Sequence, residues 1–263
     1  MEFKLKERYD VADLRAIMQL LRAPEGCPWD REQTHVSIAS NMLEEAYEAV
    51  DAIEHDDSAE LCEELGDVLL QVVFHAQMAA EDEAFNFDDV ADGICQKLIV
   101  RHPHVFAAEK AENAEAVLKN WDAIKRAAKG DKPQSAIMQG LPAVMPALMR
   151  AEKVRGRAGR VGFDHETAEQ ARADLDAEMV ALDVAMDSGN TGAIEDELGD
   201  VLFATVNVAR RLGVEPERAL RRAVDRFICR FAQMEQLAAQ RGVAITEKGL
   251  WEAAKSIEPL DHK

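Results

Sequence analysis

The segment Glu64-Leu-Gly-Asp67-Val-Leu-Leu-Gln-Val-Val returns in the second half of the chain as Glu197-Leu-Gly-Asp200-Val-Leu-Phe-Ala-Thr-Val. Both copies set a Glu-x-x-Asp motif in an otherwise apolar run that has no period-two alternation, which is typical of a largely buried helix rather than a strand. Self-similarity over a long separation is the signature of a duplicated structural unit. The sequence therefore predicts two related helical domains.

Two further features repeat at nearly the same separation. Trp121-Asp-Ala-Ile-Lys125 returns as Trp251-Glu-Ala-Ala-Lys255. A pair of basic residues one helical turn apart also recurs, as Lys97 and Arg101 in the first copy and Arg226 and Arg230 in the second. Both features lie slightly farther from the Glu-x-x-Asp motif in the first copy. This difference requires a longer loop there, which we expect near residues 81–87.

The boundary between the copies is marked by prolines. Pro133, Pro142 and Pro146 fall in one short stretch. They cannot all lie inside a helix. We therefore expect domains at residues 1–130 and 147–263, joined by a proline-containing linker over residues 131–146.

Apolar periodicity and capping residues predict an all-α fold, in which each half forms a small helical bundle. No stretch of the sequence alternates for long enough to require a sheet. In the first half, the expected helices cover residues 10–22, 38–53, 58–80, 88–102 and 113–128.

The overall charge limits the classes of partner. Across its 263 residues the chain has 31 Lys and Arg against 50 Asp and Glu, a net charge of −19. This balance disfavours nucleic acid and anionic membrane surfaces, both of which need a basic face. The four cysteines are scattered and form no metal-binding pair, so we expect reduced thiols in a cytoplasmic protein. They are Cys27, Cys62, Cys95 and Cys229.

The negative charge is concentrated in the first half. Residues 1–130 contain 13 basic and 28 acidic residues, and no Lys or Arg occurs between Arg31 and Lys97, where 18 acidic residues lie. One interpretation is a solvated acidic surface. The other is a cation site, because an acidic run without internal partners repels itself.

The spacing of the acids favours the cation site. Glu60, Glu64, Asp67 and Gln71 form one narrow stripe along an otherwise apolar helix. A buried carboxylate is costly unless it is paired or bound to a metal ion.

The preceding helix carries more acids, in the segment Glu44-Glu45-Ala-Tyr-Glu48. Glu45 and Glu48 share a face. Periodicity alone puts them opposite the Leu43 side, in solvent, unless another helix packs on them. Carboxylates from two helices would suit hard divalent cations such as Mg²⁺.

Three stretches of the first half resemble the MazG family of nucleoside triphosphate pyrophosphohydrolases. They are Glu44-Glu45-x-x-Glu48 with Glu64-x-x-Asp67, Gly26-Cys-Pro-Trp-Asp-Arg-Glu-Gln-Thr-His35, and Arg101-His-Pro-His-Val-Phe106. In the second half, Gly162-Phe-Asp164 and the second Glu-Leu-Gly-Asp look like the C-terminal copy of a tandem member. The resemblance implies two tandem MazG-like helical bundle domains.

The resemblance also implies an activity. Members hydrolyse NTPs or dNTPs to a nucleoside monophosphate and pyrophosphate, require Mg²⁺, with Mn²⁺ as an alternative, and usually form dimers. It assigns metal binding to four carboxylates, activation of the attacking water to Glu44, and substrate contacts to four further residues. The metal-binding set is Glu45, Glu48, Glu64 and Asp67, and the substrate-binding set is Lys97, Arg101, Trp121 and Lys125.

The second copy departs from this pattern. When the two Glu-Leu-Gly-Asp segments are aligned, Glu44, Glu45 and Glu48 correspond to Ala177, Glu178 and Ala181, and alanine has no ligand atom. We therefore expect catalysis in the first domain and a structural, dimerising or nucleotide-sensing role for the second. The counterparts that the second copy retains are Glu178, Glu197, Asp200, Arg226, Arg230, Trp251 and Lys255.

Two other classes of protein fit parts of the pattern. A di-iron bundle needs two Glu-x-x-His motifs on separate helices. Only Glu32-Gln-Thr-His35 has that spacing. An acidic helical scaffold, or a nucleotide-sensing protein without turnover, is the non-enzymatic alternative. It predicts no metal-dependent hydrolysis.

Overall fold

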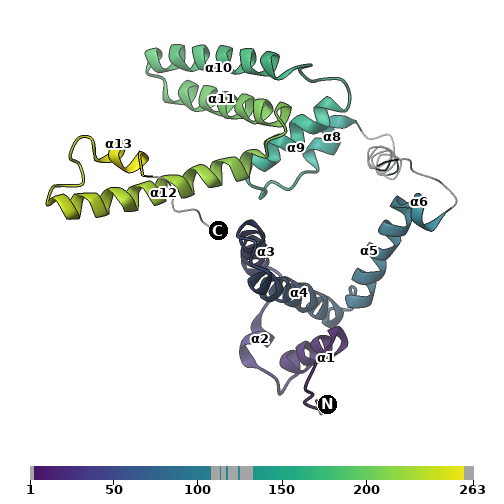
Figure 1. Cartoon of the computed structure of the whole chain (residues 1–263). Helices are drawn as coiled ribbons and strands as arrows, with labels where there is room; N and C mark the ends of the chain where they lie inside the picture. Colours follow the sequence, from purple (N-terminus) through teal and green to yellow (C-terminus); the bar gives the residue numbers. More distant parts are fainter. Residues whose placement is uncertain (1–2, 108–112, 114–116, 118–123, 125–132, 258–263) are drawn as a thin grey trace. The chain divides into compact units, whose positions relative to one another are not determined.

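The computed structural model describes residues 3–107, 113, 117, 124 and 133–257. Within these residues the regular secondary structure is entirely helical, which confirms the all-α prediction (Figure 1). The chain divides into two compact units, and the division along the sequence falls near residue 130.

The first unit begins and ends its longer helices close to the expected positions. Asp10 and Asp13 form a capping box at the start of α1, and the Asp57 carboxylate accepts two backbone N–H groups at the start of α4. Such caps satisfy donors that a helix leaves open at its N-terminus. The short α2 and α6 were not predicted, and the helix expected at 113–128 lies almost entirely outside the described residues. The helices of this unit are α1 (Val11–Arg22), α2 (Pro28–Glu32), α3 (Ala39–Glu54), α4 (Ser58–Glu81), α5 (Phe87–Arg101) and α6 (Pro103–Phe106).

An antiparallel pair, α3 and α4, forms the centre of this unit, with α1 packed on α4 (Figure 1). The apolar core lies between α1, the start of α3 and the C-terminal half of α4. Its buried members are Met18, Ile38, Val73, Phe74 and Met78.

The two halves of α4 differ in burial. Its buried residues all lie at or after Gln71, whereas Leu65, in the first half, is 54% exposed. The expectation of a largely buried helix therefore holds only for the C-terminal half. The core and α1 cover that half, whereas among the described helices only α3 packs along the other.

A single arginine ties the end of α4 to the N-terminal segment. Arg22 of α1 has an 8% exposed side chain, donates hydrogen bonds to both Glu81 oxygens at 2.7 to 3.0 Å, and also donates to the Asp30 carbonyl oxygen. Its guanidinium lies over the Phe74 ring, 5.5 Å from the centroid. The negative face of the ring attracts this cation. The hydrogen bonds from Arg22 lower the pKa of the Glu81 carboxyl below its usual value, so the pair is ionised near neutral pH.

The second unit repeats the central antiparallel pair. Helices α10 and α11 lie side by side, α9 contacts α11 and α12, and α13 folds back onto α12 (Figure 1). Its helices are α8 (Gln134–Gln139), α9 (Ala147–Gly159), α10 (Ala168–Ser188), α11 (Thr191–Arg211), α12 (Pro216–Arg241) and α13 (Leu250–Lys255).

Part of the segment between the repeats is itself structured. Helix α8 lies inside residues 131–146 and packs against α9, where the Gln134 amide donates to the Arg157 carbonyl oxygen at 3.0 Å. Leu141 is buried. This segment therefore contributes to the packing of the second unit.

Among the described helices, none is both long enough and apolar enough to cross a bilayer.

The Arg22 contacts should matter more to stability than the exposed ion pair between Arg15 and Asp88, which has two hydrogen bonds of 2.7 and 2.9 Å. We expect Arg22→Met to lower the free energy of unfolding by about 2–4 kcal/mol, since it leaves the Glu81 carboxylate without its cation, with only the hydrogen bond from the Gln77 amide among the described residues. Arg15→Met should cost less than about 1 kcal/mol. Urea unfolding of the full-length variants measures both, and equal losses would contradict this ranking.

Candidate active site

Three carboxylates meet between α3 and α4. Glu45 and Glu48 project from α3 and Glu64 from α4, and each offers an oxygen that lies within 4.8 Å of the others. The tight connection at residues 55–57 keeps the two helices antiparallel and adjacent, so these side chains face one another.

Burial and neighbouring charge shift two of these carboxyl groups. Burial raises the pKa of Glu45 above its usual value, and the largest contribution from a charge comes from Asp67. Burial likewise raises the pKa of Glu64, followed by the charges of Glu48 and Asp67. Asp67 is not among the three residues whose oxygens meet, but its negative charge acts on both Glu45 and Glu64.

The orientation of α3 differs from the one that its periodicity alone predicts. Glu45 is half-buried against α4, whereas Leu43 on the opposite face is 53% exposed. Periodicity alone places the apolar face of α3 on the core, but α4 packs on the acidic face instead. Glu45 is partly covered there, and Glu48 stays exposed at its edge.

The donor set fits a hard divalent cation. The three residues that meet offer carboxylate oxygens only, and Asp67, the fourth predicted ligand, would add another. Mg²⁺ and Mn²⁺ prefer such oxygens. No ion pair in the described part of the chain neutralises these four residues. A cation would relieve the repulsion that the raised pKa values report.

The other predicted site residues are less closely gathered. Glu44 precedes Glu45 on α3, is exposed, and contributes to the field at Glu45. Lys97 and Arg101 lie on α5, which packs on α4 at the far end from the carboxylates. Trp121 and Lys125 lie outside the described residues.

A second acidic cluster occupies the corresponding place in the second unit. Glu178 of α10 and Glu197 and Asp200 of α11 each offer an oxygen within 4.8 Å of the others. Burial raises the pKa of Glu178, followed by the charges of Asp200, Asp174 and Glu197. The retained carboxylates of the second copy therefore do come together, although Ala177 and Ala181 contribute no ligand atom.

Asp174 was not singled out by the sequence. It lies one turn before Glu178 on α10, where the alignment of the two copies gives Asn41 in the first. Asp174 lies one turn outside the motif positions, where an alignment of the two copies extended by that turn gives this fourth carboxylate.

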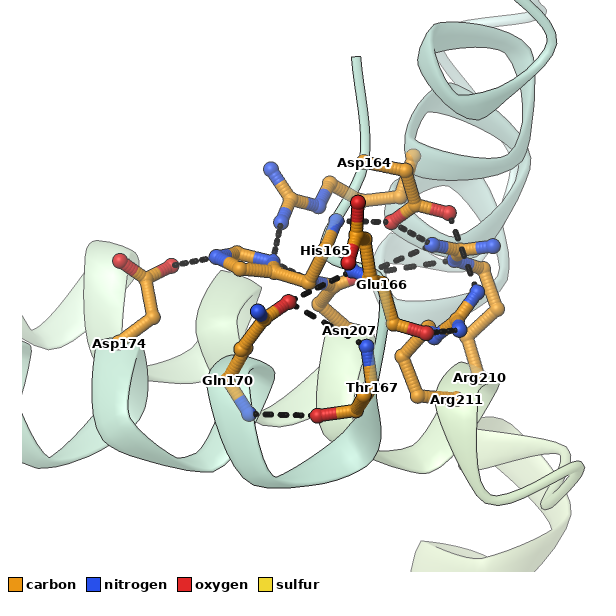
Figure 2. Close-up of polar contacts among 10 residues, drawn as sticks. Asp164, His165, Glu166, Thr167, Gln170, Asp174, Asn207, Arg210 and Arg211 are labelled. Carbon is orange, nitrogen blue, oxygen red and sulfur yellow. Dashed lines mark hydrogen bonds and ion pairs between the residues drawn. The ribbon is translucent and has the colours of Figure 1, made fainter. Parts of the chain in front are cut away.

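A polar network fixes the segment in front of α10 (Figure 2). The fully buried Asn207 amide donates to His165 Nδ1 at 2.8 Å, and Arg155 approaches the same nitrogen at 3.3 Å. Because Nδ1 accepts, the ring proton of the neutral imidazole is on Nε2. This Nε2 faces an Asp174 oxygen at 3.8 Å.

The same network includes an ion pair. Burial alone would raise the pKa of Asp164, but hydrogen bonding and charge from Arg210 outweigh it and lower this pKa below its usual value. Arg211 pairs with Asp164 at 3.5 Å and also donates to the Glu166 carbonyl oxygen (Figure 2).

The basic and aromatic counterparts of the second copy lie on other helices. Trp251 packs against Phe227 of α12, with ring centroids 5.2 Å apart, and Lys255 lies 5.8 Å over the Trp251 ring and pairs with Glu252 at 3.0 Å. Arg226 and Arg230 are on α12. Over residues 133–257, no ion pair joins these cations to the acidic cluster.

Comparison with known proteins agrees with the geometry. Residues 33–106 match the model of the MazG nucleotide pyrophosphohydrolase domain. The chain is 46% identical over 239 residues to the nucleoside triphosphate pyrophosphohydrolase of Escherichia coli K12, which covers 89% of this chain and 90% of that protein. It is 43% identical over 249 residues to the nucleoside triphosphate pyrophosphohydrolase/pyrophosphatase MazG of Thermotoga maritima, covering 92% and 94%. With its paired acidic helices and this identity over most of its length, the chain belongs to the MazG family.

Proposed function

We propose that this chain hydrolyses nucleoside triphosphates, with ribose or deoxyribose, to nucleoside monophosphate and pyrophosphate in a Mg²⁺-dependent reaction. The observation that carries this proposal is the group of facing carboxylates on α3 and α4, without a basic partner in the described residues. Relatives that are named nucleoside triphosphate pyrophosphohydrolases over nearly their full length support the same substrate class.

In this proposal the cation is held by Glu45, Glu48, Glu64 and Asp67, with Mn²⁺ as an alternative to Mg²⁺. When bound, such an ion offsets the negative charge, polarises the α-phosphate and lowers the pKa of a bound water. The chain's own carboxylates orient the ion, and their number suits one or two such ions.

Glu44 is our candidate for the proton acceptor. Its carboxylate is exposed and directly precedes a ligand on α3. It is therefore accessible to a water molecule at the edge of the cluster, as a general base must be. Attack of this water on the α-phosphorus breaks the bond to the bridging α–β oxygen, and pyrophosphate leaves.

The triphosphate also needs cations on the side away from the metal. We assign this role to Lys97 and Arg101 of α5 and to Lys125, with Trp121 beside the nucleotide. For the second copy the corresponding residues are Arg226, Arg230, Lys255 and Trp251.

A homodimer would bring these groups together. Helix α5 has no buried residue, and large apolar side chains on α3 and α5 are exposed in the single chain. Exposed apolar side chains of this size suit a surface that another protein covers. A second copy packed on this surface would bring α5 of one chain near α3 and α4 of the other. The exposed residues are Met42, Leu43, Tyr47, Val50 and Ile53 on α3, and Val90, Ile94, Leu98, Ile99 and Val100 on α5.

We assign the catalytic role to the first unit. The second has Glu178, Glu197 and Asp200, but Ala181 replaces a ligand and Ala177 replaces the proposed proton acceptor. It would hold a cation more weakly and serve in structure, dimerisation or nucleotide sensing.

Two broader assignments complete the proposal. We take residues 1–130 and 147–263 as the two repeats, with 131–146 connecting them. We also infer a cytoplasmic location, because all four cysteines are unpaired. Unpaired thiols are expected in a reducing compartment.

The bond that is cleaved can be read from the products. Incubation with ATP or dATP and Mg²⁺ should yield the monophosphate and pyrophosphate, and in ¹⁸O-labelled water the label should enter the monophosphate. Ion-exchange chromatography and mass spectrometry measure both. Diphosphate and orthophosphate as the first products would exclude this mechanism, and no turnover at all would favour the acidic scaffold or the nucleotide sensor.

Removing one carboxylate should stabilise the metal-free protein. Because the folded-state pKa of Glu45 is raised, its ionisation costs stability as the pH rises through that pKa. Glu45→Gln should therefore raise the melting temperature at pH 8 without metal, with a smaller gain near pH 5, and should lose most of the additional stabilisation by Mg²⁺. Thermal unfolding with and without Mg²⁺ measures this. A lower metal-free melting temperature with the Mg²⁺ effect intact would identify Glu45 as a structural partner.

A matched pair of variants tests which of the two units is catalytic. Glu64→Gln should reduce turnover by at least about 10²-fold, as expected for loss of a ligand to a catalytic ion, whereas Glu197→Gln should change it by less than about threefold. Circular dichroism and the mass in solution control for folding. A well-folded but inactive Glu197→Gln protein beside an active Glu64→Gln protein would make the second unit the catalyst.

A further inference from the structure

One buried polar atom on α4 has no hydrogen-bond partner among the described residues. Gln71 is 6% exposed, and its amide oxygen has no hydrogen-bond partner in the described part of the chain. An unsatisfied buried polar atom destabilises the fold, so its presence calls for a physical reason. A bound ligand that supplies the missing hydrogen bond is such a reason.

Gln71 lies on the same face of α4 as the carboxylates. It follows Glu64 by two turns and Asp67 by one turn of the helix. Residues at these spacings share a face, so Gln71 continues the row of Glu64 and Asp67 along the helix axis. Because α3 and α4 run antiparallel, Asn41, one turn before Glu45 on α3, lies toward the same end of the helix pair as Gln71. One turn beyond the carboxylates, the helix pair therefore carries two amide side chains, Asn41 and Gln71, and no charged one. We call this pair of residues the amide level.

The next turn of α4 offers no free partner either. His75 lies one turn after Gln71, and its Nδ1 is 2.8 Å from His35 Nδ1, with the two rings stacked. These two imidazoles hydrogen-bond to each other through their Nδ1 atoms. The Gln71 amide oxygen, in contrast, is buried and has no partner among the described residues.

The chemistry of the amide oxygen limits what can bind it. As an acceptor it needs a donor, and neither a phosphate group at neutral pH nor a neighbouring carboxylate supplies one. No Lys or Arg occurs between Arg31 and Lys97. The sequence around Gln71 is therefore also poorly suited to phosphate. Sugar hydroxyls and base N–H groups of a nucleoside do provide donors.

We propose that Gln71 hydrogen-bonds a donor on the nucleoside part of the substrate and so helps to select the nucleotide. This inference rests on the proposed function, because the α-phosphate at the carboxylates fixes where the nucleoside begins. The sugar is attached directly to that phosphate, so it follows along α4 toward Gln71, and the base lies beyond it.

The second unit lacks this arrangement. In the alignment of the two copies, Gln71 corresponds to Ala204, Asn41 to Asp174 and His75 to Val208. Ala204 is buried without any polar side-chain atom. The amide level is therefore a feature of the first unit, where we place turnover.

The test compares Gln71→Met with Gln77→Met in the full-length chain. Gln77 lies on the same helix, but its amide already donates to Glu81 at 2.9 Å, so it controls for loss of an amide. Values of kcat/KM are measured with ATP, dATP and dideoxy-ATP, which remove sugar donors in turn, and with GTP, ITP and purine riboside triphosphate, which vary the base donors.

Gln71→Met should lower kcat/KM on the order of tenfold for substrates that carry the donor and leave it unchanged for the analogue that lacks it. The sugar series or the base series then identifies the donor. The melting temperature should rise, because an unsatisfied amide is replaced by an apolar side chain. Gln77→Met should leave every substrate ratio unchanged.

Three results would overturn the inference. These are an equal loss for every substrate, no loss for any, or a fall in Mn²⁺ affinity measured by calorimetry, which would make the amide oxygen a metal ligand. Affinities for non-hydrolysable α,β-methylene nucleotides, determined in parallel, separate this inference from the proposed function. If the wild-type protein binds these nucleotides but hydrolyses none, the proposed function fails, while the affinity ratios still decide the role of Gln71. If it binds none, the inference fails too.

Discussion

Mutual repulsion among facing carboxylates on α3 and α4 is the constraint on which the proposed site of the first unit depends. Burial and neighbouring charge raise the pKa values of Glu45 and Glu64. The folded chain therefore holds these groups together at a cost. The apolar core under the second half of α4 and the Arg22 contacts supply the rigidity that offsets it. A divalent cation would relieve that repulsion. It would bind favourably, because the negative charges are already held in place and need no reorganisation.

The two copies carry different polar side chains on their paired helices. The first keeps the full carboxylate set and continues it with the amides of Asn41 and Gln71. The second lacks carboxylates at Ala177 and Ala181 but has Asp174 one turn before Glu178, beside the ring of His165. The antiparallel helix pair recurs in both units, whereas the side chains along it differ. This difference explains why one family resemblance over the whole chain need not imply two equivalent sites.

Much of this could be predicted from the sequence, for identifiable reasons. The limits of α1, α3, α4 and α5 lie close to the expected ones. They follow from local periodicity and capping, which need no tertiary information. Which face of a helix is covered depends on its neighbours, so the half-buried position of Glu45 and the exposed first half of α4 could not be read from single-helix periodicity. Asp174 lies outside the family motif, and the missing partner of Gln71 becomes visible only once the surrounding side chains are in place.

The most direct test of the central claim is to locate the metal itself. Anomalous scattering from crystals of the full-length chain grown with Mn²⁺ and a non-hydrolysable nucleotide would show where the ion binds. The account predicts a peak at about 2.0–2.3 Å from carboxylate oxygens of Glu45, Glu48, Glu64 and Asp67, next to the α-phosphate. A nucleotide-bound structure with no peak there, or with a peak only between Glu178, Glu197 and Asp200, would contradict it.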